Sequence, residues 1–151
     1  MTTEHWVDLK NGTWSHPWSA GPARIIPQWM LGVRPLQRAW RRVAVHPQPG
    51  TRLQFANMSV PTLRGPIHTS FSVVHGSSFV LNLKLPGNTR AEVCLPTGVL
   101  AHGHGNESEC EVHLTLDGSP SGHVTPFDRP GQSCLPVDVR SGQHQVTARC
   151  A

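Results

Sequence analysis

Hydrophobic and polar residues alternate along the middle of the chain. From Phe71 to Leu85, apolar residues recur at every second position on both sides of a polar turn. Side chains of a β-strand point alternately to its two faces, so this period of two indicates strands with one face on a core and the other in water. The expected inward positions are Phe71, Val73, Phe79, Leu81, Leu83 and Leu85, and the expected outward positions are Ser72, Ser78, Asn82 and Lys84.

Short segments of the same kind continue from residue 40 to the end of the chain, separated by Gly, Pro, Asn and Asp. Residues 98–110 and 118–132, rich in Gly, Ser, Pro and His, are expected to be loops. The predicted fold class is therefore mainly β, an antiparallel β-sandwich of about eight strands preceded by a short helical segment. The predicted strands are residues 40–46, 51–57, 66–74, 78–85, 90–95, 111–116, 135–139 and 143–148.

Before residue 35 the apolar spacing changes to three and four, which is typical of a helix. Ser15 or Ser19 can cap this helix, and Pro22 suits its first turn. We expect Pro27 to kink or split the helix and Gly32 to end it. The helix-spaced apolar residues are Ile25, Ile26, Trp29 and Met30.

Tryptophan marks the same division of the chain. All five tryptophans lie in the first 40 residues, and none lies in the remaining 111. The first segment thus carries more apolar surface than one short helix can bury on a small domain. We therefore expect it to pack against a large neighbouring structure. The tryptophans are Trp6, Trp14, Trp18, Trp29 and Trp40.

Composition and charge exclude several classes of protein. The 14 Gly and 14 Pro disfavour a helical bundle, and no apolar stretch approaches the ~18 residues of a membrane span, so no membrane partner is expected. The net charge of +4 is small and scattered along the sequence, so no nucleic-acid partner is expected. The densest basic cluster, residues 38–42, is interpreted as a solvated strand entrance, with phosphate binding as the alternative.

The four cysteines, Cys94, Cys110, Cys134 and Cys150, form no C-x-x-C pair. We therefore expect two disulfides rather than a zinc site, with three connectivities open. Three N-glycosylation sequons, at residues 11, 57 and 106, also favour an oxidising, extracellular location. The first six residues do not resemble a signal peptide, so either the protein is not secreted or the chain is part of a longer one.

Common catalytic motifs are absent: the sequence has no G-x-S-x-G, P-loop, G-x-G-x-x-G or H-E-x-x-H. The stretch 102–111 offers imidazoles and carboxylates without ordered ligand spacing, so it is interpreted as a solvated loop, and no metal or cofactor is expected. Residues 2–22 are different, because they combine Glu4, His16 and several indoles, the composition of a sugar-binding subsite. Helix packing by tryptophan is the alternative for this segment.

Five sequence blocks occur in order across residues 13–96, and they resemble the carboxy-terminal stretch of the α-L-rhamnosidase family of glycoside hydrolases. The resemblance implies that residues 1–34 are the last helical hairpin of a truncated six-hairpin helical barrel, and that residues 35–151 are a C-terminal β-sandwich domain. The blocks are T-W-S-H-P-W-S-A-G-P-A, L-G-V-R-P-L, V-A-V-H-P-Q-P-G, V-P-T-L-R-G-P-I-H-T-S-F and L-P-G-N-T-R-A-E-V-C-L-P.

The resemblance also implies an inverting mechanism with two carboxyl groups. Glu4, followed by Trp6, matches the general base, although a carboxylate at a helix start is the alternative. His16 matches a residue that binds rhamnose, and the general acid has no counterpart in this chain. The expected function is that of a C-terminal fragment, inactive alone, of an enzyme that hydrolyses terminal α-L-rhamnosides. The fragment is expected to pack on a missing helical barrel.

Two alternatives remain open at this stage. One is a non-catalytic module that binds carbohydrate or serves a structural role, and it would need exposed aromatic side chains on the sandwich. Beyond residue 41 the aromatic residues are Phe55, Phe71, Phe79 and Phe127. The other alternative is a secreted interaction module held by disulfides.

Overall fold

The structure is a computed structural model that describes residues 21–50, 52–101, 112–121, 125–126, 132–135 and 138–150. It opens with a helical segment in which α1, Gly21–Ile25, continues directly as a π-helical turn, η2, Ile26–Met30. Pro27 has no N–H to donate and its ring crowds the preceding turn, so the regular α-helix cannot continue through it. The chain instead closes a wider turn in which the Leu31 N–H donates to the Ile26 carbonyl at 3.2 Å. The predicted break at Pro27 is confirmed.

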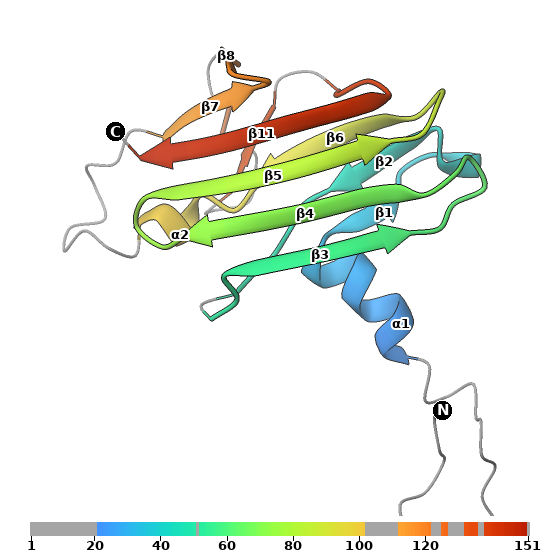
Figure 1. Ribbon diagram of the computed structural model, residues 1–151, viewed down its shortest axis with the longest axis horizontal. Helices are drawn as coiled ribbons and strands as arrows, with labels where there is room; N and C mark the ends of the chain where they lie inside the picture. Colours follow the sequence, from blue (N-terminus) through green and yellow to red (C-terminus); the bar gives the residue numbers. More distant parts are fainter. Residues whose placement is uncertain are drawn as a thin grey trace, which may run out of the picture.

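Two sheets form the rest of the described protein, and Figure 1 shows them as two layers, with the six-stranded sheet in front. The five-stranded sheet has the order β1 (Val33–Pro35), β2 (Arg42–Val45), β6 (Arg90–Leu95), β10 (Ser133–Cys134) and β9 (Thr125–Pro126). The six-stranded sheet has the order β3 (Phe55–Val60), β4 (Ile67–Val74), β5 (Ser78–Leu85), β11 (Gly142–Cys150), β7 (Val112–Leu116) and β8 (Ser119–Pro120). Short helical turns lie at η3 (Arg38–Trp40) and α2 (Gly98–Ala101). The predicted mainly β sandwich is confirmed.

Among the described strands all pairs are antiparallel except one: β2 pairs with β6 in parallel, with Arg42 opposite Arg90. Between these two strands the chain builds β3, β4 and β5 in the other sheet, and it returns to the first sheet in the direction in which it left. Parallel neighbours need such a long crossover, whereas the antiparallel neighbours β4 and β5 need only a tight turn.

The core lies between the two sheets and consists of the inward side chains of their central strands. The rings of Phe71 and Phe79 stack there with centroids 5.3 Å apart. All six positions predicted to face inward on β4 and β5 are buried, and none of the four predicted to face outward is buried. The five-stranded sheet contributes Val43, Val45, Ala91, Val93 and Leu95 to the same core.

Several boundaries differ from the prediction. β3 begins at Phe55 rather than residue 51, because the chain first turns at Gly50, whose φ is +64°. The strand expected at 135–139 is wrong: β10 is Ser133–Cys134, and Val139 forms an isolated bridge with Ala91. The expected loop at 118–132 contains the short strands β8 and β9, and the expected loop at 98–110 begins with α2.

One disulfide joins two neighbouring strands, because Cys94 of β6 pairs with Cys134 of β10. Cys150 is also disulfide-bonded. The fourth cysteine, Cys110, lies outside the described residues. Among the described residues, no helix is long and apolar enough to cross a membrane.

Candidate functional site

The two site residues expected from the family resemblance, Glu4 and His16, lie outside the described residues. The part of the opening segment that the structure describes starts at Gly21. Its helical part is held to the sandwich at its C-terminal end, where the Gln48 N–H donates to the Met30 carbonyl at 2.8 Å. Leu31 and Val33, which follow, are both buried. The segment is therefore anchored where it enters the sandwich.

Large apolar side chains of this segment project from the anchored end into solvent. Ile25 is 56% exposed and Trp29 is 53% exposed, and Ile26 is also exposed, as is Leu36, which lies outside this segment directly after β1. These four make up most of the seven large apolar side chains that are exposed among the described residues. Figure 1 shows α1 extending away from the sandwich beside β3. We call Ile25, Ile26 and Trp29 the apolar helix face.

One edge of this face carries a cation. The guanidinium of Arg34, on β1, lies 5.4 Å from the ring centroid of Trp29. A cation over an indole ring is attracted by the ring quadrupole, which restrains the orientation of the ring. Trp29 is thus both exposed and held in place.

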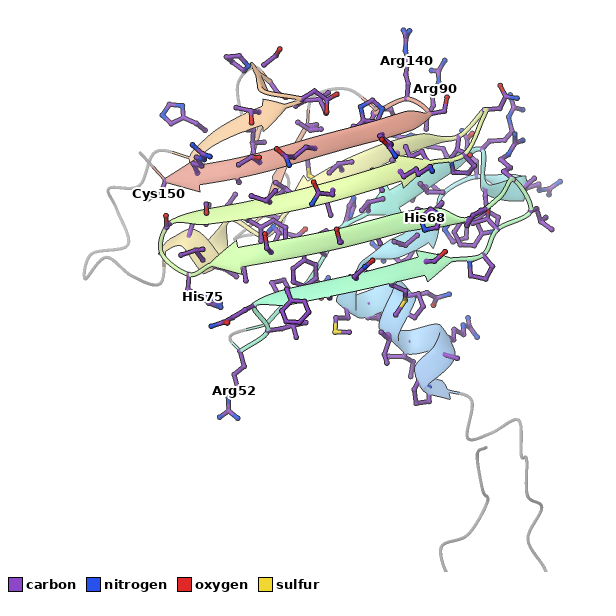
Figure 2. All side chains as sticks on the ribbon, in the orientation of Figure 1. Arg52, His68, His75, Arg90, Arg140 and Cys150 are labelled. Atoms are coloured by element: carbon purple, nitrogen blue, oxygen red, sulfur yellow. A yellow bond between two sulfur atoms is a disulfide. The ribbon has the colours of Figure 1, made fainter. Side chains whose placement is uncertain are left out.

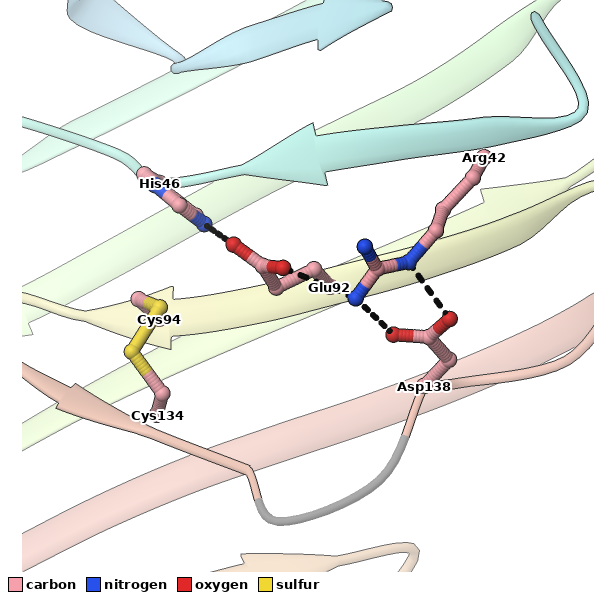
Figure 3. The surroundings of a disulfide bond; sticks show 6 residues. All are labelled: Arg42, His46, Glu92, Cys94, Cys134 and Asp138. Atoms are coloured by element: carbon pink, nitrogen blue, oxygen red, sulfur yellow. Dashed lines mark hydrogen bonds and ion pairs between the residues drawn. A yellow bond between two sulfur atoms is a disulfide. The ribbon is translucent and has the colours of Figure 1, made fainter. Parts of the chain in front are cut away.

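A charged network lies on the five-stranded sheet, next to the disulfide (Figure 3). Arg42 donates to both carboxylate oxygens of Asp138, at 2.7 and 3.0 Å, and to Glu92 at 2.9 Å. His46 Nε2 lies 3.2 Å from the other oxygen of Glu92. The hydrogen bond to Asp138 is the main reason that the pKa of Arg42 is raised. The network links β2 and β6 to Asp138, which lies shortly before β11, so we assign it a structural role.

The same region brings three potential metal ligands together, since atoms of His46, Glu92 and Cys94 lie within 4.8 Å of one another. The sulfur of Cys94 is bonded to Cys134, however, and metals bind thiolates rather than disulfide sulfurs. Glu92 is also already engaged by Arg42 and His46. The cavity beside them, of 290 Å³, does not present a free ligand set.

A second hollow, of 480 Å³, lies on the outer face of the six-stranded sheet. The strand register places Asn57, Ser70, Asn82 and Gln145 in one row across β3, β4, β5 and β11. Gln145 Nε2 donates to Asn82 Oδ1 at 3.0 Å, which fixes both amides. We call these four residues, three with amide side chains and one with a hydroxyl, the amide row.

Asp117, at the turn between β7 and β8, closes one end of this hollow. Its carboxylate accepts the backbone N–H of Gln145 at 2.8 Å and lies 2.8 Å from His144 Nδ1. The backbone hydrogen bond is the main cause, and His144 the second, of a pKa of Asp117 below its ordinary value. The hollow is thus bounded by an ionised carboxylate that the fold holds in position.

The alternation of the strands predicted that Asn82 faces outward, but it did not predict the amide row. The period of two assigns each residue to a face and leaves its cross-strand neighbour undefined. The row depends on the register of three strand pairs, and residues 57 and 145 lie far apart in the sequence.

Residues 32–109, just over half of the chain, match the family described as bacterial alpha-L-rhamnosidase C-terminal domain. An alpha-L-rhamnosidase of Streptomyces avermitilis is 28% identical over 129 residues, which are 81% of this chain and 10% of that protein. This chain therefore spans about a tenth of the length of that relative.

Solved structures share the fold. The alpha-L-rhamnosidase of Dictyoglumus thermophilum aligns with a TM-score of 0.71 at 14% identity, covering 91% of this chain and 14% of that one. The Streptomyces avermitilis alpha-L-rhamnosidase, complexed with L-rhamnose, aligns with a TM-score of 0.65 at 24% identity, covering 90% and 12%. The similarity noted in the sequence blocks is thus confirmed, and the chain belongs to the family of bacterial alpha-L-rhamnosidase C-terminal domains.

Proposed function

We propose that this chain works as the carboxy-terminal module of an α-L-rhamnosidase-like glycoside hydrolase and packs through the apolar helix face on the helical barrel of that enzyme. The observation that carries the proposal is the position of Ile25 and Trp29, which are exposed on a helical segment whose other end is anchored in the sandwich. Contiguous exposed apolar surface marks interaction sites in soluble proteins. The Streptomyces avermitilis relative is about tenfold longer than the matched region, which leaves room in such an enzyme for a barrel against which this face would pack.

The division of the chain follows from the same proposal. The helical part of residues 1–34 would belong to the last hairpin of the barrel, and residues 35–151 to the sandwich, together with Val33 and Arg34, which the structure places in β1. The sandwich would then pack against the end of the barrel and stabilise its position.

In the complete enzyme, the substrates would be rhamnose-containing glycosides and the reaction would be inverting hydrolysis. Glu4 would take a proton from the water that attacks the anomeric carbon, and His16 would bind the rhamnose. A second carboxyl group, roughly 6.5–9.5 Å away, would protonate the leaving oxygen, and it would come from another part of the enzyme. Without that group this chain would have no catalyst for the departure of the leaving group.

Hydrolysis of an aryl α-L-rhamnoside tests this part of the proposal. The chain alone is expected to give no turnover above the uncatalysed rate. Turnover that disappears in Glu4→Gln and persists in the charge-matched control Glu107→Gln would contradict the proposed inactivity.

We also propose an extracellular location. Cys94 and Cys134 form a disulfide that is buried in the sandwich, and such bonds persist in oxidising compartments.

The second candidate function is binding of a neutral carbohydrate by the outer face of the six-stranded sheet. The observation that favours it is Phe55, which is 73% exposed and lies on the same face as the amide row, two residues before Asn57. An exposed ring can stack on a sugar while amides bind its hydroxyl groups. Titration of the chain with L-rhamnose and neutral oligosaccharides tests this function. Sub-millimolar binding that is lost in Phe55→Ala and Asn82→Ala, and kept in Leu63→Ala, would support it.

A further inference from the structure

Arginine side chains gather at one end of the sandwich, although they are scattered in the sequence. A hollow of 950 Å³ lies at the end where β2 and β6 begin. Five of the eleven arginines of the chain line it. We call this the arginine hollow, and its arginines are Arg41, Arg42, Arg64, Arg90 and Arg140.

The fold brings these residues together from four places in the chain. The parallel pairing of β2 with β6 sets Arg42 opposite Arg90, and the Arg90 N–H donates to the Arg41 carbonyl at 3.0 Å. Arg140 follows Val139, which bridges to Ala91. Figure 2 shows Arg90 and Arg140 projecting together from one end of the molecule, whereas Arg52 projects elsewhere.

Most of this positive charge is not neutralised by the described part of the chain. Arg42 is bound by Asp138 and Glu92. No carboxylate among the described residues lies within ion-pair distance of Arg41, Arg64, Arg90 or Arg140. Like charges held close together repel one another, so an anion bound in the hollow would reduce the repulsion between the guanidinium groups.

The backbone around the hollow is strained. Ala39 and Trp40 have positive φ, at +53° and +57°, in which their side chains are strained, and Asn88 at +58° turns the chain on the other side of the hollow without such strain. Arg64 ties these turns together, because its Nε donates to the Ala39 carbonyl at 2.6 Å and its Nη1 to the Asn88 carbonyl at 3.3 Å. Backbone strain of this kind clusters at ligand-binding sites.

A buried hydroxyl at the hollow also lacks a partner. Thr89 lines the hollow and is 1% exposed, and its Oγ1 has no hydrogen-bond partner among the described residues. Leaving a buried hydroxyl unsatisfied costs free energy, and a water held between Thr89 and the hollow would satisfy it. This observation is independent of the charge.

The chemistry of the lining identifies the ligand class. Guanidinium groups bind carboxylates with paired hydrogen bonds, and the amides and hydroxyl of Gln37, Asn88 and Ser141 suit sugar hydroxyl groups. No aromatic side chain from the described part of the chain lines the hollow, whereas sites for single-stranded nucleic acids rely on aromatic stacking. We propose that the arginine hollow binds the carboxylate groups of an acidic glycan, that is, a chain containing uronic acid residues. This proposal does not depend on the packing of the apolar helix face.

The test is calorimetric titration of the whole chain with an oligogalacturonate. The variant Arg90→Gln/Arg140→Gln removes two exposed charges from the hollow. Its matched control, Arg52→Gln/Arg149→Gln, removes two exposed arginines outside the hollow and leaves the same net charge. We expect the hollow variant to bind at least tenfold more weakly and the control to change less than threefold. Equal losses in the two variants, or no binding by the unmodified chain, would overturn the proposal.

Two further ligands distinguish the sources of negative charge. A sulfated oligosaccharide of matched length is expected to bind more weakly than the oligogalacturonate. Both ligands carry hydroxyl groups, but only the carboxylates of the oligogalacturonate match the paired N–H groups of a guanidinium. Duplex DNA that binds as tightly as the oligogalacturonate would overturn the proposal in favour of a general polyanion surface. Thermal unfolding of both variants serves as the folding control, since all four substituted side chains are exposed.

Discussion

The backbone of His46 occupies the space in which a side chain on Gly32 would begin. The two residues are joined across β1 and β2, because the His46 N–H donates to the Gly32 carbonyl at 3.2 Å. Gly32 also has a φ of +68°, which ends the helical segment and turns the chain into β1. This one position therefore sets the angle at which the apolar helix face leaves the sandwich.

Gly32→Ala is expected to destabilise the protein by at least about 2 kcal/mol, because the strain of a positive φ adds to the displacement of the His46 backbone. Gly50→Ala is the matched control: its φ is +64°, but no atom lies near the added carbon. The control should cost only about 1–2 kcal/mol. Urea unfolding measures both, and equal costs in the two variants would contradict the role assigned to His46.

The disulfide between Cys94 and Cys134 closes a loop with a sequence separation of 40. Cys94→Ala/Cys134→Ala is expected to lower the free energy of unfolding by about 4 kcal/mol, because the unfolded chain regains the entropy of that loop. Denaturant unfolding under non-reducing conditions measures this change. A loss below about 1 kcal/mol would show that the strands hold without the bridge.

Cys150 is disulfide-bonded, and Cys94 and Cys134 bind each other, so we expect the second bridge to join Cys150 to Cys110. Peptide mapping of the non-reduced protein should find one cross-linked peptide for each bridge and no free thiol. A peptide joining Cys94 to any cysteine other than Cys134 would contradict the observed pairing.

Asp117 makes stability depend on pH in a definite direction. Its pKa in the folded protein lies below the value of about 3.9 in an unfolded chain, so its ionised form stabilises the fold above that value. This contribution is lost as the pH falls through the folded-state pKa. Asp117→Asn should therefore cost at most about 1 kcal/mol at pH 7, because the carboxylate is half-exposed, and the cost should shrink in acid.

Asparagine suits this comparison because it tolerates the positive φ of residue 117, which is +52°. Unfolding at pH 7 and at a pH below 3 gives the two differences. A cost for Asp117→Asn that is the same at both pH values would rule out the assigned linkage.

The sequence predicted those parts of the fold that depend on alternation within one segment. β5 and β6 begin and end at the predicted residues, because Phe79 to Leu85 and Ala91 to Leu95 carry their burial pattern locally. β1 was missed because three residues, one of them Pro35, are too short to show a period. The parallel pairing of β2 with β6 was missed because alternation defines the faces of a strand and not its partner.

The candidate sites were less predictable for the same reason. The surplus of apolar residues around Ile25 and Trp29 is visible in the sequence, and the exposure of these two side chains agrees with it. The arginine hollow was not predicted, because Arg64, Arg90 and Arg140 come from separate turns and meet only once both sheets have formed. Glu4 and His16 remain predictions from the family resemblance.

The central claim is that the apolar helix face packs on a helical barrel. It is tested most directly by measuring binding of this chain to the Streptomyces avermitilis alpha-L-rhamnosidase from which the homologous C-terminal region has been removed. We predict that the chain binds, that Ile25→Ser and Trp29→Ser each weaken binding at least tenfold, and that the controls Leu63→Ser and Phe55→Ser, at side chains that are more exposed still, do not. No binding, or equal losses in all four variants, would contradict the account.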